Sequence, residues 1–117
     1  MREPIRDKER LIHIIEAIDR IQNRVPALDL DSLLQDALLY YGVVKSIEII
    51  REAVYKLSTS FKDAHPQTVW ENIEGMRHVL VHDYYQILPD RVLHVVINDL
   101  PPLRSQIEQY LSEMELQ

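Results

Sequence analysis

The sequence predicts an all-α protein, an up-and-down bundle of four to five helices. Apolar residues recur at helical spacing in several long segments, and no segment has the alternation typical of a strand. Only two glycines occur among the 117 residues, which argues against a protein rich in hairpin turns. Hydrophobic residues make up 46% of the chain, so we expect one core and a single domain over residues 1–117.

Composition also limits the function classes. The formal net charge of -6 argues against a general nucleic-acid coat but allows a local basic patch, because binding depends on the field near the site. The absence of cysteine excludes disulfides and thiolate chemistry and suits a reducing cytoplasm. Met1–Pro4 lacks the apolar core of a signal peptide, and no apolar run reaches the length of a membrane span. We therefore expect a cytoplasmic protein with no membrane contact.

The first helix is expected from roughly Pro4 to Asn23. Pro4 suits a helix start, and Asp7 and Glu9 lie near the positive end of the helix dipole. The apolar residues of this segment recur at helical spacing and form one stripe: Leu11, Ile14, Ile15, Ile18 and Ile21.

A long second helix is expected from about Asp31 or Ser32, either of which could cap it, to Leu57. Its apolar residues surround most of the helix, which indicates cover on more than one side. In a domain this small we infer that a subunit interface supplies part of that cover. Gly42 in mid-helix costs about 1 kcal/mol relative to alanine. We expect a compensating role for it, which is to allow close helix packing.

The rest of the chain should hold shorter elements. Ser58–Gln67 reads as a polar connector, and a third helix begins near Thr68. Pro89 separates it from a short helix over about Asp90–Val96, Asn98–Pro102 forms a break, and the last helix covers about Leu103–Glu115. The expected core contacts of the third helix are Val69, Trp70, Ile73, Met76, Leu80 and Val81.

The third helix carries the best candidate for a working site. An arginine, two histidines, a carboxylate and a phenol surround three consecutive aliphatic residues in Arg77–Tyr84. The aliphatic residues favour a buried helix, yet polar groups are costly to bury unless they are paired. The polar members of the segment are Arg77, His78, His82, Asp83 and Tyr84.

Arg77, His82 and Tyr84 stand as Arg-x4-His-x-Tyr, which resembles the HEPN superfamily, specifically the HepT-like toxins paired with minimal nucleotidyltransferase antitoxins. Three further segments resemble the family in the same order: Ile47–Ala53, His65-Pro66 through Trp70, and Asn98–Pro101 followed by Leu103. Together they cover about the last three-fifths of the chain. The chain departs from the family at Arg51, where glycine is usual, and at His78, where asparagine is usual. Arg51 could crowd the site or add a phosphate contact.

The resemblance implies a metal-independent endoribonuclease without a cofactor, held inactive by its antitoxin. In such a reaction the substrate's own 2′-hydroxyl attacks the phosphate, which needs a base, an acid and positive charge. Histidine suits both proton roles, since its unperturbed pKa is near ~6.5. The planar guanidinium of arginine suits the phosphate. The hypothesis is that His82 transfers protons and that Arg77 binds phosphate and stabilises the transition state, with His78 and Asp83 in support.

On an ideal helix Arg77 and His82 lie roughly 140° apart, so they do not share a face. Either Arg77 reaches around, or the helix loosens near His82, or the pair works across two chains. A homodimer through the second and third helices would place two motifs in one cleft. Glu52, or Glu48 one turn earlier, could pair with Arg77 and hold it.

Other interpretations stay open. Taken alone, Arg77 is more typical of a structural ion pair than of a catalytic residue. His82 is likewise more typical of a core or surface histidine, and Trp70 is more typical of a core residue than of a base-stacking platform. His78 and His82, at i and i+4, could bind nickel or zinc adventitiously with Asp83 or His94. The glutamate that marks zinc proteases is absent, because Val79 occupies its place.

The resemblance also implies that the antitoxin transfers AMP from ATP to the motif tyrosine, here Tyr84, with Tyr85 as an alternative acceptor. The added charge beside Arg77 would repel RNA. As a competing class, the chain could be a non-catalytic helical partner or substrate-binding subunit of a minimal nucleotidyltransferase, which its acidic charge favours.

Overall fold

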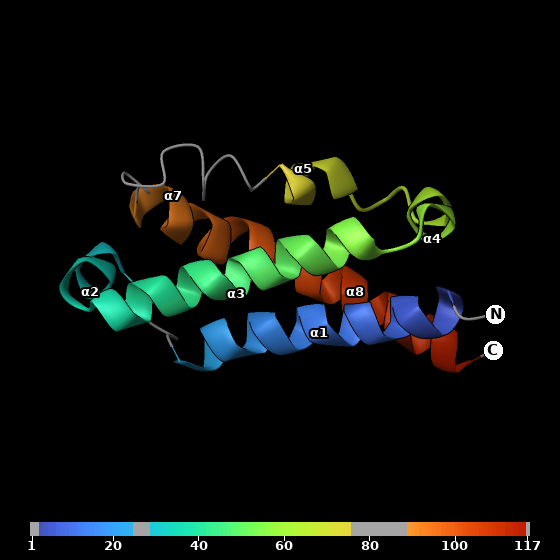
Figure 1. Ribbon diagram of the computed structural model, residues 1–117, viewed down its shortest axis with the longest axis horizontal. Coiled ribbons are helices and arrows are strands. Elements are labelled where there is room, and N and C mark those ends of the chain that lie inside the picture. Colours follow the sequence, from blue (N-terminus) through green and yellow to red (C-terminus); the bar gives the residue numbers. More distant parts are fainter. Residues whose placement is uncertain (1–2, 25–28, 76–88, 117) are drawn as a thin grey trace.

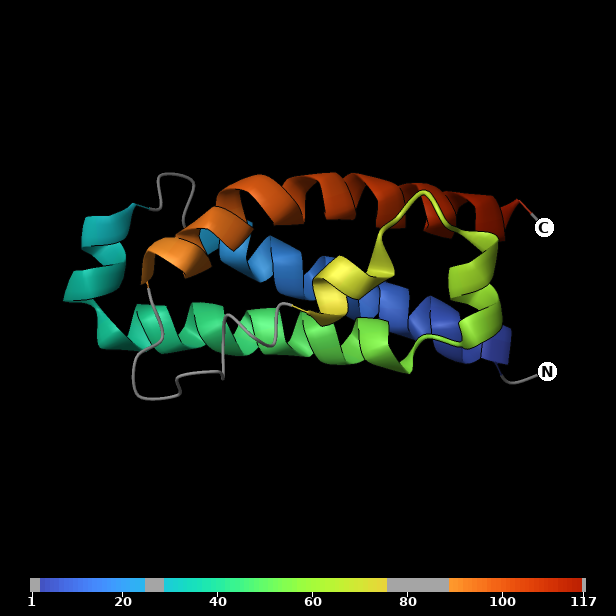
Figure 2. The same cartoon turned by 90° about the horizontal axis from the view of Figure 1, so that it is seen from above.

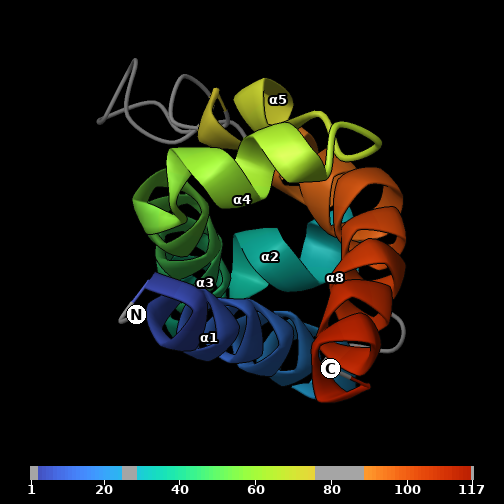
Figure 3. The same cartoon turned by 90° about the vertical axis from the view of Figure 1, so that its right-hand side faces the viewer.

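The computed structural model describes residues 3–24, 29–75 and 89–116, and in these ranges every regular element is a helix. Three long helices form the frame: α1 (Glu3–Arg24), α3 (Ala37–Lys56) and α8 (Leu100–Glu115). Seen end-on, they stand at three corners, with α4 (Thr59–Ala64) across one end and α2 (Leu30–Gln35) across the other (Figure 3). The all-α bundle expected from the sequence is confirmed.

Helix α1 follows the prediction closely and packs against both other long helices (Figures 1 and 2). Four residues of its apolar stripe lie in the core, Leu11, Ile14, Ile18 and Ile21, and the fifth, Ile15, is partly buried against it. Near its start, Asp7 is only 4% exposed. Its carboxylate accepts hydrogen bonds from the backbone N–H of Ser58 (2.9 Å) and from the Ser58 hydroxyl (2.7 Å). This contact ties α1 to the junction between α3 and α4.

The expectation of one continuous helix from Asp31 or Ser32 to Leu57 is wrong. The chain breaks at Asp36, whose extended backbone (φ −125°, ψ 97°) ends α2 and begins α3. The Asp36 carboxylate accepts a hydrogen bond from the Leu39 N–H (3.1 Å). Asp29 and Ser32 cap α2 reciprocally, so the predicted cap at Asp31 or Ser32 is also displaced. Aspartate satisfies free N–H groups at helix starts better than it fits helix interiors, which explains the break.

The expected connector between Ser58 and Gln67 contains a helix, α4, which the sequence pattern did not predict. The Ser58 hydroxyl, itself bonded to Asp7, accepts a hydrogen bond from the Phe61 N–H (3.1 Å) and caps α4. With six residues, α4 shows little periodicity, and its apolar contact is the single side chain of Phe61. A capped turn of this length depends on packing rather than on propensity.

The third helix begins later than expected, at α5 (Trp70–Glu74). Val69, expected in the core, is 53% exposed, whereas Trp70 is buried as expected. The rest of the predicted third helix lies outside the described residues. Gly75 ends α5, and its N–H donates to the Glu71 carbonyl (2.8 Å).

The predicted break at Asn98–Pro102 is wrong. Helix α7 (Pro89–His94) continues through a π-helical turn, Val95–Asp99, directly into α8. Within this turn the Leu100 N–H donates to the Val95 carbonyl, five residues back. The two prolines that suggested a break occupy the first positions of α8, where a missing N–H costs little.

Gly42 does not serve close packing among the described residues of this chain, contrary to expectation. A Cβ atom placed there would meet nothing within 4 Å among the described residues, so Gly42 borders open space. None of the described helices is both long enough and apolar enough to cross a membrane.

Candidate functional site

The motif residues Arg77, His78, His82, Asp83 and Tyr84, and the alternative acceptor Tyr85, all lie in 76–88, outside the described residues. The structure does describe the helices that precede and follow this segment. Both α5, before it, and α7, after it, pack against α3. The candidate segment is therefore joined at each end to a helix fixed on α3, the helix that also carries the family-like Ile47–Ala53.

An aromatic cluster fixes α5. The rings of Phe61, Trp70 and Tyr110 lie with centroids 5.8 to 6.1 Å apart, and His65 stacks on Phe61 at 4.1 Å. The Trp70 indole N–H donates to the His65 carbonyl (3.0 Å). Burial raises the pKa of the Tyr110 phenol, although its hydrogen bond with Thr68 opposes this change. The expectation that Trp70 is a core residue is confirmed, and the cluster anchors the start of α5.

The end of α5 is held by a charge pair. Lys62 of α4 contacts Glu74, one residue before Gly75, with Nζ and Oε1 2.8 Å apart. The side chains of Lys62 and Glu74 are 18% and 32% exposed. The same Nζ also lies 3.3 Å from the Val54 carbonyl oxygen. Because such a pair is partly shielded from water, it fixes geometry better than a surface pair does. The candidate segment thus starts from a well-held turn.

The glutamates proposed to hold Arg77 have other partners in the described chain. Glu52 pairs with Lys56 (3.2 Å), and Glu48 lies 4.0 Å from Lys45. All four residues lie on α3, so these are ordinary exposed pairs within one helix, each worth a few tenths of a kcal/mol. The proposed contacts with Arg77 fall outside the described residues. Arg51 is half-exposed on the same helix.

The alternative of a metal site has one described member. His94 is exposed, and its Nδ1 lies 3.1 Å from the Asn98 side-chain nitrogen. The described ranges contain no group of three or more side chains placed to hold a metal ion. The other candidate ligands, His78, His82 and Asp83, lie outside those ranges.

The outer face of α3 has a second notable feature. Six residues at alternating spacings of three and four point away from the core; we call them the outer stripe: Leu38, Tyr41, Lys45, Glu48, Glu52 and Tyr55. Leu38 is 86% exposed, Tyr41 64% and Tyr55 66%. This spacing matches that of a coiled-coil seam, although three of its positions, Lys45, Glu48 and Glu52, are charged where a seam is usually apolar. The stripe is consistent with the expectation that this helix needs cover on more than one side.

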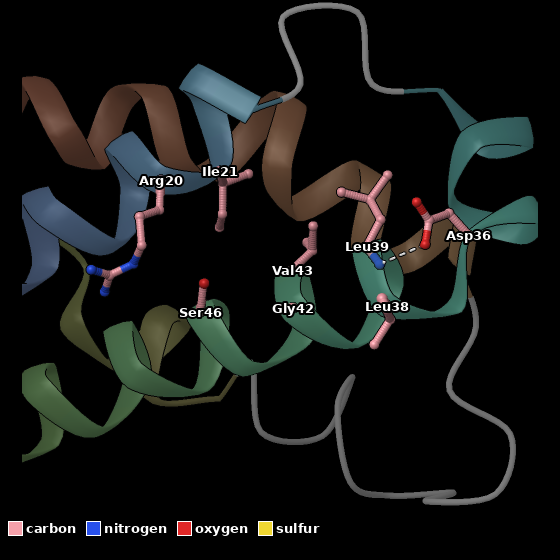
Figure 4. Close-up of a pocket in the computed structure, with 8 residues that line it drawn as sticks. All are labelled: Arg20, Ile21, Asp36, Leu38, Leu39, Gly42, Val43 and Ser46. Carbon is pink, nitrogen blue, oxygen red and sulfur yellow. Dashed lines mark hydrogen bonds between the residues drawn. The ribbon is translucent and has the colours of Figure 1, made fainter.

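A pocket of about 530 Å³ lies between α1 and α3. Figure 4 shows Arg20 and Ile21 entering it from α1, and Leu39, Val43 and Ser46 from α3, with Gly42 beside them. Asp36 also lines the pocket, but its carboxylate caps α3. The sequence pattern alone groups Arg20 with the other polar residues of α1 and does not indicate this pocket.

Arg20 belongs to a set of basic residues that the sequence reasoning missed. Arg6, Arg10, His13 and Arg20 lie within about 80° of each other around α1, since each residue turns about 100°. We call them the basic row. The signal that could have found them is their spacing of i, i+4, i+7 and i+14. Glu9 and Glu16 lie only about 20° and 40° from Arg20 on the same ideal helix, so this face carries both charges.

Comparisons with known proteins match most of the chain. The model of the HepT-like ribonuclease family matches residues 14–110. "Putative RNase TTE0752" of Caldanaerobacter subterraneus subsp. tengcongensis is 29% identical over 103 residues, covering 88% of this chain and 92% of the relative. "Putative RNase MJ0127" of Methanocaldococcus jannaschii is 30% identical, covering 90% and 87%. "Probable ribonuclease HepT" of Thermococcus cleftensis is 29% identical, covering 87% and 93%. The search of solved structures gave no significant match.

The chain therefore belongs to the HepT-like ribonuclease family of HEPN proteins.

Proposed function

We propose that this protein is a metal-independent endoribonuclease toxin of the cytoplasm, active as a homodimer and neutralised by a minimal nucleotidyltransferase antitoxin. The observation that carries the proposal is family membership over residues 14–110, a range that contains Arg-x4-His-x-Tyr at residues 77–84. The described frame supports it, because the helices on both sides of this segment pack on α3. We propose that residues 1–117 perform this ribonuclease role as a single HEPN-like domain.

The chemistry follows from the two residue types. One imidazole takes the proton of the 2′-hydroxyl, whose oxygen attacks the adjacent phosphorus. The bond from phosphorus to the 5′-oxygen breaks, a second imidazole protonates that oxygen, and a 2′,3′-cyclic phosphate remains. His82 from each of two copies supplies both proton roles. Arg77 stabilises the negative charge that builds on the phosphate oxygens.

The test is cleavage of a mixed RNA pool by purified protein in the presence of EDTA. We expect cleavage by the wild type and a loss of about 100-fold or more in Arg77→Ala and in His82→Ala, the scale of losing a positioned acid or base. Arg91→Ala and His94→Ala are matched controls, since both side chains lie exposed on α7. Equal cleavage by all five proteins would leave only a non-catalytic helical partner.

The outer stripe of α3 supports the homodimer. If two copies of α3 pack antiparallel about a two-fold axis between Ser46 and Ile47, every stripe residue meets a complementary one. Leu38 then faces Tyr55 of the second copy, Tyr41 faces Glu52, and Lys45 faces Glu48. The first contact is apolar, the second joins a phenol to a carboxylate, and the third joins opposite charges. This self-complementarity is what an isologous interface requires.

Charge reversal tests this interface. Lys45→Glu places like charges opposite each other, so we expect dimer dissociation to increase by about tenfold in sedimentation equilibrium. Lys45→Glu combined with Glu48→Lys restores opposite charges in the interface and should restore the dimer. Lys8→Glu, an exposed charge reversal on α1, is the control. If the Lys45→Glu, Glu48→Lys double variant dissociates as readily as Lys45→Glu alone, this register of the two α3 helices is wrong.

For regulation, we propose that the antitoxin transfers the AMP group of ATP to the Tyr84 hydroxyl and releases pyrophosphate. The new phosphodiester brings negative charge and bulk beside Arg77 and competes with RNA. Intact mass after incubation with antitoxin and ATP should rise by one AMP in the wild type and in Tyr85→Phe. Unchanged modification of Tyr84→Phe would assign the acceptor to another residue.

A further inference from the structure

Two pockets flank the start of α5, which lies on the outside of the bundle (Figure 3). One pocket, of about 560 Å³, lies between α5 and the π-helical turn with the start of α8; we call it the α8-side pocket. The other, of about 470 Å³, lies between α5 and α4; we call it the α4-side pocket. Thr68, Val69 and Glu71 line both pockets, and we call these three residues the α5 ridge. The residues that line the two pockets are all described, and none belongs to the outer stripe.

Both pockets carry net negative charge. The α8-side pocket is lined by Glu71 and Asp99, and its described lining includes no lysine, arginine or histidine. The α4-side pocket is lined by Asp63, Glu71 and Glu74, and its cation, Lys62, pairs with Glu74 at 2.8 Å. In the described ranges, Asp63, Glu71 and Asp99 take part in no ion pair. Three carboxylates around the α5 ridge are therefore available to a cation from outside.

The α8-side pocket also has more hydrogen-bond acceptors than donors to offer. The Thr68 hydroxyl donates to the Gln106 side-chain oxygen (2.8 Å), and the Gln106 amide donates to the Gln67 carbonyl (3.3 Å). The Asn98 amide nitrogen donates to the His94 carbonyl (3.2 Å). These bonds use up side-chain donors, whereas the ionised carboxylates of the pocket add acceptors alone. Such a lining suits a ligand with several N–H donors and a positive charge, and a guanidinium group has both.

The α5 ridge is apolar at its centre and is held in place from below. Val69 is 53% exposed, whereas the neighbouring Trp70 is buried and its indole N–H donates to the His65 carbonyl (3.0 Å). Thr68 is 3% exposed and is tied to α8 through Gln106. A surface that is already fixed loses little conformational entropy when a partner binds. An exposed apolar side chain between two acidic pockets is thus a preformed site for a protein segment that is apolar at its centre and basic on both sides.

We propose that the α5 ridge docks a basic segment of the antitoxin, with an apolar side chain of that segment on Val69 and one cationic side chain in each pocket. The inference rests on the proposed function and adds to it the surface that recognises the antitoxin. Gly75 lines the α8-side pocket and lies nine residues before Tyr84 in the chain. An antitoxin docked on the α5 ridge is therefore bound close in sequence to the tyrosine that it modifies.

The charge of the two pockets disfavours the other candidate occupants. RNA phosphates would be repelled by Asp63, Glu71 and Asp99, because the described lining supplies no cation beyond the paired Lys62. A divalent metal ion would need several converging ligands, and the described part of the chain holds no group of three or more placed for one. A basic protein segment matches both the charge and the exposed valine.

The first test measures, by fluorescence anisotropy, the binding of a labelled ten-residue peptide with one arginine on each side of a central leucine. The wild type should bind it about tenfold more tightly than the same peptide with uncharged citrulline in place of arginine. Asp63→Asn and Asp99→Asn should each weaken binding about threefold, the scale of one exposed ion pair. Glu71→Gln should weaken it about tenfold, because Glu71 lines both pockets.

Glu9→Gln is the matched control for Glu71→Gln, since it removes the same charge from an exposed position on α1. Val69→Lys places a repelling cation on the α5 ridge and should also abolish most of the binding, with unchanged helicity by circular dichroism. If Glu71→Gln and Val69→Lys bind the peptide as tightly as Glu9→Gln does, the α5 ridge is not a docking site for basic segments.

The second test uses the antitoxin and separates this proposal from the function on which it rests. Glu71→Gln combined with Asp99→Asn should weaken the complex with the antitoxin and slow AMP transfer, while RNA cleavage without antitoxin stays unchanged. If antitoxin affinity is unchanged, the docking proposal is wrong, and His82-dependent cleavage still supports the ribonuclease. If the double variant instead loses RNA binding and Glu9→Gln does not, the surface binds substrate and the docking proposal is again wrong. Absence of any His82-dependent cleavage would reject the ribonuclease proposal, and the peptide assay would still decide whether the α5 ridge binds a basic segment.

Discussion

Removal of the Asp7 carboxylate should destabilise the whole bundle. Asp7 is buried, and it accepts one hydrogen bond from the Ser58 backbone and one from the Ser58 hydroxyl, at 2.9 and 2.7 Å. Hydrogen bonds to charged groups are each worth about 1.5–3 kcal/mol, and neighbouring bonds are not fully additive. We therefore expect Asp7→Ala to lower the free energy of unfolding by about 3 kcal/mol. For a chain of this length that corresponds to a fall in Tm of about 10 °C or more.

Urea unfolding followed by circular dichroism measures this change. Asp7→Asn keeps one acceptor oxygen and should lose about half as much as Asp7→Ala. Glu9→Ala, an exposed carboxylate on the same helix, is the control and should stay within about 0.5 kcal/mol of the wild type. If Asp7→Ala matched Glu9→Ala, the contact with Ser58 would not connect α1 to the α3–α4 junction as argued.

Three further changes test the frame. Asp36→Ala removes the cap of α3 and should lower the free energy of unfolding in urea by about 1 kcal/mol. Asp36→Ser can still cap the helix and should keep most of that stability, so equal losses in the two variants would contradict capping. Arg104→Gln breaks the partly exposed ion pair with Asp19 (2.7 Å) and should lower the free energy of unfolding by about 1 kcal/mol or less. The loss should fall toward zero in 1 M salt, because salt screens the pair. A loss that does not depend on salt would mean that packing of the side chain dominates. Burial raises the pKa of Tyr110 above its unfolded value, so its contribution to stability is complete below about pH 10 and is lost as pH rises through the folded pKa. Tyr110→Phe should show a smaller loss between pH 9 and 11 than the wild type, and an unchanged pH profile would contradict this assignment.

The long helices could be predicted from the sequence because their periodicity extends over many turns. The stripe from Leu11 to Ile21 defines α1, and Ile107 and Tyr110 lie on the buried side of α8. The short elements could not be predicted in this way. Helix α4 depends on the capping serine and the contacts of Phe61, neither of which creates a repeat.

Three errors share a physical cause: a local signal was given the wrong weight. Asp36 appeared compatible with a continuous helix, but its side chain satisfies a free N–H and the chain breaks there. Pro101 and Pro102 suggested a break, yet prolines fit the first turn of a helix, and α8 follows the π-helical turn directly. Gly42 suggested close packing, whereas it borders an open pocket, which only the position of α1 can reveal.

The candidate site stays a prediction from its motif, which spacing and residue type make visible in one sequence, because its residues lie outside the described ranges. The basic row was not predicted, because its members alternate along α1 with Glu9 and Glu16. On an ideal helix Arg20 lies about 20° from Glu9 and about 40° from Glu16 but about 80° from Arg10, so spacing does not separate a basic face of α1 from an acidic one.

The end groups of the products test most directly whether Arg77 and His82 cut RNA through its own 2′-hydroxyl. Purified protein is incubated with a defined RNA in EDTA, and the fragments are analysed by mass spectrometry. We expect 2′,3′-cyclic phosphate and 5′-hydroxyl ends from the wild type and no cleavage when a single 2′-deoxy nucleotide replaces the one at the cut. Fragments with 3′-hydroxyl and 5′-phosphate ends, or cleavage at the 2′-deoxy position, would contradict this mechanism.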